Sequence, residues 1–69
     1  MRFECEKIEV CEDDSPYIKL VIYEIQPDGK SAVLDITHHN TEREADDFLA
    51  DHWNLTSPPT FGVRQRFEN

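Results

Sequence analysis

The sequence predicts an α+β fold: a small antiparallel sheet of three strands, or of four, with one helix packed on one face. Two observations predict it. Three runs rich in β-branched and aromatic residues fill the first half of the chain and are separated by turn residues. A helical pattern follows, with a cap signal before it and prolines after it. The expected order is β-β-β-α, with a further C-terminal strand left open, in a single small domain over residues 1–69.

The first predicted strand covers residues 2–11, RFECEKIEVC. Its apolar residues change phase midway along the strand. Phe3 and Cys5 share one face, whereas Ile8 and Val10 share the other. The change of phase indicates either a β-bulge or a strand whose two faces are each partly covered.

The second predicted strand, YIKLVIYEI at residues 17–25, follows a turn at residues 12–16. It is apolar on both faces, which is typical of a central strand. The turn QPDGK at residues 26–30 contains the Pro and Asp-Gly signals of a hairpin connection. It leads into the alternating run SAVLDIT at residues 31–37, so we expect the second and third strands to pair.

The helix is expected to begin after Thr41, because Thr41 and Glu44 form a T-x-x-E capping box. Its apolar residues recur at helical spacing and form one stripe: Ala45, Phe48, Leu49, His52 and Trp53. The segment TSPPT then ends the helix. The final FGVRQRFEN alternates and predicts either a last edge strand or a packed tail.

The helix stripe should cover one face of the sheet and leave the other bare. We expect the covered face to carry Ile18, Leu20, Ile22, Leu34 and Ile36. The remaining face would carry Tyr17, Val21, Tyr23 and Val33. One helix cannot cover both faces, so the C-terminal tail, a second copy or a partner would have to cover the other one.

The histidines and cysteines do not form a recognisable chemical site. His38 and His39 are adjacent, so on a strand they point in different directions, and neither H-x-x-x-H nor C-x-x-C occurs. Cys5 and Cys11 lie roughly 20 Å apart on an extended strand, too far for a disulfide. Their neighbours are acidic or apolar, which disfavours an activated thiolate. We therefore expect no metal, no cofactor, no catalytic residues and no enzyme.

Location follows from the same residues. Two unpaired thiols favour a reducing compartment. The start of the chain has no apolar signal-peptide core, and no apolar run reaches transmembrane length. We therefore expect a cytoplasmic protein.

The charge is the most informative feature for function. Fifteen acids stand against seven bases, for a net charge of −8. That balance argues against direct binding to nucleic acid, which needs clustered Lys and Arg, and against anionic membranes. It favours a cationic protein partner, or else solubility alone.

The predicted helix presents carboxylates in two rows away from its apolar stripe. One row is Glu44, Asp47 and Asp51, and the other is Glu42 and Asp46. Cβ atoms three or four residues apart on a helix are about 5–6 Å apart. Successive phosphates along one nucleic-acid strand are roughly 6–7 Å apart, so the spacing is similar. The alternative is an ordinary solvated face. A second acidic cluster occupies the first turn: Glu12, Asp13 and Asp14.

A strongly acidic chain of 69 residues, with TEREADDFLAD on its one helix and no catalytic motif, resembles the small phage-encoded inhibitors. Anti-CRISPR proteins are the prominent example. The resemblance covers size, charge and general make-up. It implies an inhibitor that occupies the basic groove of a nucleic-acid-handling protein, with Tyr17, Tyr23 or Trp53 as aromatic anchors. The alternative function is a homodimeric structural or accessory module that buries the uncovered sheet face against a second copy.

Overall fold

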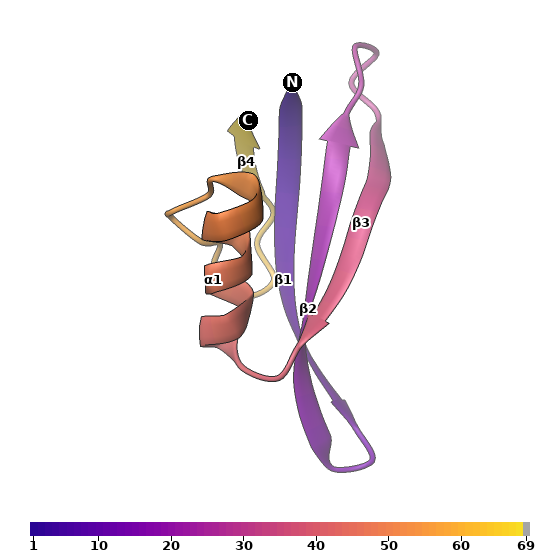
Figure 1. Cartoon of the computed structure of the whole chain (residues 1–69). Coiled ribbons are helices and arrows are strands. Elements are labelled where there is room, and N and C mark those ends of the chain that lie inside the picture. Colours follow the sequence, from indigo (N-terminus) through magenta and orange to yellow (C-terminus); the bar gives the residue numbers. More distant parts are fainter. Residues whose placement is uncertain (69) are drawn as a thin grey trace.

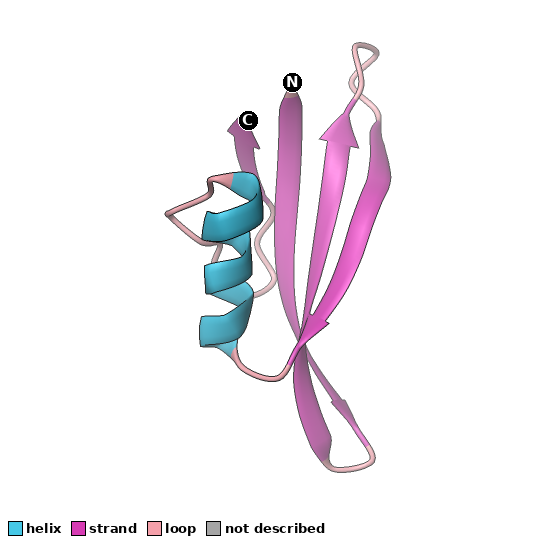
Figure 2. Ribbon diagram, viewed as in Figure 1, coloured by secondary structure: helices cyan, strands magenta, loops and turns pink. Residues whose placement is uncertain are grey.

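The computed structural model describes residues 1–68 and confirms the α+β class (Figures 1 and 2). Four strands and one helix follow one another as β1 (Arg2–Glu12), β2 (Ser15–Ile25), β3 (Ser31–His39), α1 (Glu42–Trp53) and β4 (Gln65–Glu68). The strands form one antiparallel sheet in the order β3-β2-β1-β4. The C-terminal strand that the sequence left open is therefore present, as a short edge strand beside β1.

β1 runs its whole length without a bulge, because its pairing with β2 stays in register from Phe3 to Glu12. The phase change in its apolar residues was predicted to reflect either a bulge or partial covering of both faces. The structure shows the second: both faces are partly covered. Phe3, Cys5 and also Lys7 are buried on the face toward α1. Ile8 and Val10 lie on the opposite face and are half-buried.

The turn between β1 and β2 is shorter than predicted. Only Asp13 and Asp14 lie outside the strands, and both have positive φ, 49° and 62°, as a two-residue type I′ turn requires. Pro16 is tolerated inside β2 because β3 ends opposite Ile18, so no ladder hydrogen bond to β3 is lost there. The distal part of this hairpin is a two-stranded ribbon that projects beyond α1 and β3 (Figure 1). It contributes to the elongated shape, 40 × 22 × 17 Å.

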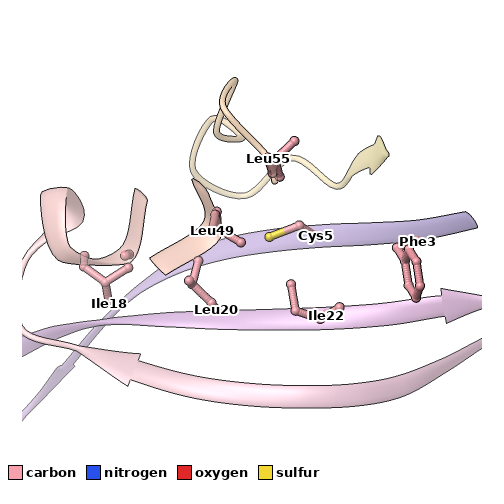
Figure 3. Packing of buried hydrophobic residues seen from close by; sticks show 8 residues of the cluster. Phe3, Cys5, Ile18, Leu20, Ile22, Leu49 and Leu55 are labelled. Carbon is pink, nitrogen blue, oxygen red and sulfur yellow. The ribbon is translucent and has the colours of Figure 1, made fainter. Parts of the chain in front are cut away.

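The hydrophobic core lies between α1 and one face of the sheet. Ala45 and Leu49 of α1 are fully buried, and Leu49 lies over the sheet beside Cys5 and Leu20 (Figure 3). An aromatic group closes one end of this core, where the Phe3 ring centroid lies 5.4 Å from that of Trp53 and 5.5 Å from that of Phe67. The predicted helix stripe is thus confirmed as the inner face of α1 for Ala45, Phe48, Leu49 and Trp53, whereas His52 is exposed.

The prediction that Leu34 and Ile36 of β3 lie on the sheet face covered by the helix is wrong. Leu34 and Ile36 are 50% and 47% exposed and lie away from the core. A β-bulge at Leu34 separates the Ile22–Asp35 pair from the Tyr23–Val33 pair. Ile36 consequently pairs with Val21 on the uncovered face. A one-residue change of register turns every following side chain to the other face, and alternation within one strand does not reveal it.

The N-terminal end of α1 is closed as the sequence predicts, whereas the helix ends at Trp53, before the segment TSPPT that was predicted to end it. The Glu44 backbone N–H donates to Thr41 Oγ1 at 3.2 Å, which confirms the cap. Asn54 closes the helix in the left-handed region with φ 54°. Within residues 1–68, no helix is long and apolar enough to cross a membrane.

Candidate interaction surfaces

Among residues 1–68, Lys7 is the one buried charged residue, with 2% of its surface exposed. Its Nζ lies 2.7 Å from Glu42 Oε2 and 3.0 Å from Asp46 Oδ1, on the first two turns of α1. We call these two carboxylates the inner acidic pair. Two of the acids predicted to face a partner are therefore engaged inside the molecule, although their side chains remain 52% and 30% exposed.

The surroundings of Lys7 complete a closed ion-pair site. The Phe61 ring centroid lies 4.8 Å from Nζ, and the Gly62 N–H donates to the Lys7 carbonyl at 2.9 Å. Burial by itself would lower the pKa of Lys7, but the hydrogen bonds and charges of Glu42 and Asp46 raise it above its ordinary value. One sequence signal pointed here, since Lys7 continues the phase of Phe3 and Cys5.

The three acids on the far side of α1 are exposed: Glu44, Asp47 and Asp51. We call them the outer acidic row. Glu44 also belongs to the helix cap, because its Oε2 accepts the Asn40 N–H at 3.4 Å. Nothing in the described part of the chain pairs Asp47 or Asp51 with a base. This row keeps the arrangement that the sequence predicts for it.

Glu12, Asp13 and Asp14 form the end of the projecting hairpin, and all three are exposed. We call them the hairpin tip. Figure 1 places the tip beyond the N-terminal end of α1, so it is a separate surface from the outer acidic row. The predicted acidic residues are thus distributed over three places: the inner acidic pair, the outer acidic row and the hairpin tip.

The sheet face away from α1, which we call the open face, holds Tyr23 in a polar cluster. Its hydroxyl donates to Glu6 Oε1 at 3.0 Å, and the Arg64 guanidinium carbon lies 4.0 Å from the ring centroid. Arg64 also lies 3.7 Å from Glu4 and 3.9 Å from Glu6. Burial and the Glu6 hydrogen bond raise the pKa of Tyr23, against the opposing effect of Arg64. Tyr23 is therefore held by the C-terminal segment.

The other predicted anchors differ in their exposure. Tyr17 is half-buried on the open face, where its ring centroid is 4.9 Å from that of His38. Trp53 packs in the core, and its Nε1 is buried without a hydrogen-bond partner among residues 1–68. Of the three aromatic residues, Tyr17 is therefore the one that remains as a contact residue of the open face.

Sequence reasoning placed Val33 on the uncovered face but missed the other two members of an exposed aliphatic group on β3, Leu34 and Ile36. Val33, Leu34 and Ile36 are 58%, 50% and 47% exposed, and they lie on a nine-residue edge strand. Val21, their neighbour on β2, is only 5% exposed because flanking side chains surround it. The Asp-Gly turn followed by alternating apolar and polar residues predicts a strand here. This pattern does not show which face of the strand is covered.

The cysteines and histidines are dispersed in the fold. Cys5 is buried, and burial raises the pKa of its thiol to about 12, whereas Cys11 is an exposed free thiol. His39 and His52 stand on either side of Phe48, with ring centroids 5.1 and 4.4 Å from its own. No three His, Cys, Asp or Glu side chains in the described region converge as metal ligands.

An open hollow of about 590 Å³ lies at the end of the sheet where β1 starts. It is lined by Arg2 and Arg66 together with residues of the β2–β3 turn. It is a shallow surface feature next to exposed side chains, and it contains none of the predicted site residues. Comparison with protein-family models, curated proteins and solved structures finds no match to this chain.

Proposed function

We propose that this protein is a small non-catalytic binding protein that inhibits or regulates a nucleic-acid-handling partner by occupying its basic groove. The observation that carries the proposal is the outer acidic row, three exposed carboxylates on one side of a capped helix. In this respect it would act as the small phage-encoded inhibitors of the anti-CRISPR type do.

The inner acidic pair supports this function indirectly. Glu42 and Asp46 hold the first turns of α1 on the sheet through Lys7. The outer acidic row is therefore presented by a helix that is fixed before binding, and a fixed surface loses less entropy when a partner binds. The charges of α1 have two roles: one side anchors the helix and the other meets the partner.

Spacing and charge favour a groove that ordinarily holds a phosphate backbone. Glu44, Asp47 and Asp51 are separated by three and four residues, which corresponds to a rise of about 4.5 and 6 Å along the helix. The roughly 6–7 Å between phosphates is close to this spacing. The hairpin tip adds a second acidic contact beyond the end of the helix. Binding of this kind weakens steeply with salt.

A charge-reversal variant tests the proposal. In E44K/D47K/D51K the three exposed side chains change sign. The contact of Glu44 with the Asn40 N–H is lost, but the core and the Thr41 cap, which accepts the backbone N–H of residue 44, stay in place, so circular dichroism should remain close to that of the parent. The control E24K/D28K/E68K makes the same change in net charge elsewhere on the molecule. Each protein is immobilised and used to capture partners from a bacterial lysate at low and moderate salt. Each captured protein is then assayed for nucleic-acid binding.

The expected result is a nucleic-acid-binding protein that the parent and the control retain and inhibit, and that the triple variant releases. We expect a loss of at least about tenfold in affinity, because each of three charge contacts contributes on the order of 1 kcal/mol. If the triple variant kept and inhibited the same partner, the outer acidic row would not be the binding surface.

The second candidate function is a homodimeric accessory module that buries the open face against a second copy. The specific observation that favours it is the exposed aliphatic group Val33, Leu34 and Ile36. These side chains have no covering element within residues 1–68, and single exposed apolar residues are common whereas a contiguous group is not.

A further inference from the structure

We propose that two copies of this protein join edge to edge through β3, in antiparallel orientation, to form one continuous eight-stranded sheet. The inference rests on the homodimer of the second proposed function, but it joins the two copies at the sheet edge and not through the open face. It is independent of the outer acidic row.

The first support is the length of the unpaired edge. β3 is nine residues long and is the outermost strand on its side, whereas the opposite edge of the sheet is the four-residue β4. Figure 1 shows no helix or strand beside the outer edge of β3. Unpaired N–H and C=O groups on a long edge favour the addition of another strand.

The second support is the composition of β3. Natural edge strands are commonly protected by Lys, Pro or several charges. β3 has neither Lys nor Pro, and Asp35 is its one acidic residue. Val33, Leu34 and Ile36 are instead about half exposed, so pairing of the edge would also bury aliphatic surface.

The third support is charge, and it selects a second copy as the occupant. A chain of net charge −8 repels its own copies, most strongly where acids gather on α1 and the hairpin tip. β3 carries one acid, Asp35, against four on β1 and five on α1. A basic partner would find one carboxylate on β3, whereas a second copy meets less repulsion at this edge than at α1 or the hairpin tip.

The geometry of β3 limits the register. Directly opposite residues of an antiparallel pair lie on the same face, and a two-fold axis pairs a strand with itself. Within the regular segment 35–39, a two-fold axis at Asp35 would place the carboxylates of the two copies of Asp35 directly opposite each other. A two-fold axis at His38 would pair few residues, because β3 ends at His39. The remaining registers are centred on Ile36 or Thr37. In them Asp35 faces the partner's Thr37 or the partner's His39, both of which can donate a hydrogen bond.

Disulfide trapping tests both the pairing and the register. I36C and T37C are made separately in a C11A background, which removes the exposed thiol. Residues directly opposite each other across a two-fold axis have Cβ atoms about 4.5–5.5 Å apart, within reach of a disulfide after small adjustments. With oxidised glutathione, one of the two variants should form a covalent dimer, while the control V63C, an exposed aliphatic position outside β3, stays monomeric.

Sedimentation equilibrium supplies the second measurement. The parent and V63K should be dimers, and I36K should be a monomer with unchanged circular dichroism. Added salt should strengthen the dimer, because it screens repulsion between two acidic copies. This is opposite to the salt dependence expected for the outer acidic row.

Two results would overturn the inference. A parent that stays monomeric at all protein concentrations would overturn both the edge pairing and the second proposed function. A dimer that survives I36K, with no disulfide in either cysteine variant, would overturn the edge pairing and leave the homodimeric function standing on another surface. Loss of partner capture by E44K/D47K/D51K has no bearing on either outcome, so the two proposals fail separately.

Discussion

At the residue scale, Lys7 joins the start of the helix to the sheet. Its ammonium is buried, whereas the carboxylates of Glu42 and Asp46 keep part of their surface in water. The two sides of this ion-pair site therefore respond differently to removal. A buried charge that loses its partners stays unsolvated, while a half-exposed carboxylate that loses its partner is rehydrated.

The prediction is an asymmetry between two variants in urea unfolding. E42Q/D46N should lower the free energy of unfolding by about 3 kcal/mol, because the buried ammonium loses both of its counter-charges. K7M should change it by less than about 1 kcal/mol, because Met fills the space of the lysine stem and both carboxylates return to water. The triple variant K7M/E42Q/D46N should recover most of the loss. Equal effects of E42Q/D46N and K7M would contradict this account of the site.

At the element scale, the β1–β2 hairpin has an unfavourable turn for its conformation. Asp13 and Asp14 both occupy the left-handed region, which Asn and Gly adopt more easily. Their carboxylates are adjacent and follow Glu12, so like charges also repel. The corresponding Asp28–Gly29 turn has Gly at φ 86°, where a side chain would be strained.

Replacing the hairpin turn by the preferred pair should therefore stabilise the protein. D13N/D14G is expected to raise the free energy of unfolding by about 1 kcal/mol, since left-handed backbone costs L residues roughly that amount. Thermal unfolding at fixed protein concentration measures it. The control D13N/D14A removes the same charges but keeps a Cβ at position 14, so it should stabilise less. If D13N/D14A and D13N/D14G raised the free energy of unfolding equally, charge and not backbone conformation would be responsible.

At the scale of the whole molecule, three groups within the described part of the chain, residues 1–68, bind their protons more tightly in the folded state than usual. Burial raises the pKa of Cys5 from 9.0 to about 12. Burial and Glu6 raise that of Tyr23, and the inner acidic pair raises that of Lys7. Each raised pKa contributes stability that is fully present below the ordinary pKa and is lost as pH rises toward the folded value.

The protein should consequently lose stability in alkali, starting above pH 9, where the unfolded Cys5 thiol ionises. The fall should steepen through the ordinary ranges of Tyr23 and Lys7, near 10.0 and 10.5, at about 1.4 kcal/mol per pH unit for each group. Urea unfolding at several pH values measures the slope. C5A should flatten the first part of the fall, whereas the exposed-site control C11A should follow the parent. An unchanged slope in C5A would rule out Cys5 as its source.

The fold was predictable to the level of its elements because the relevant signals are local. The Asp-Gly turn, the T-x-x-E cap and the apolar stripe of α1 each depend on residues within a few positions of one another. The candidate surface was predictable only in part. Glu44, Asp47 and Asp51 face outward as expected, but Glu42 and Asp46, on the same helix, bind a lysine 35 and 39 residues earlier in the chain.

The sequence by itself determined the fold class, the order of the elements and the acidic character of the helix, because spacing and composition act locally. Only the tertiary structure decided which acids Lys7 engages and which face of β3 is covered. Both depend on register: a bulge at Leu34 turned Ile36 to the open face, and an unbroken β1 carried Lys7 into the core beneath α1. Register is fixed by contacts between strands distant in sequence, so alternation within one strand cannot specify it.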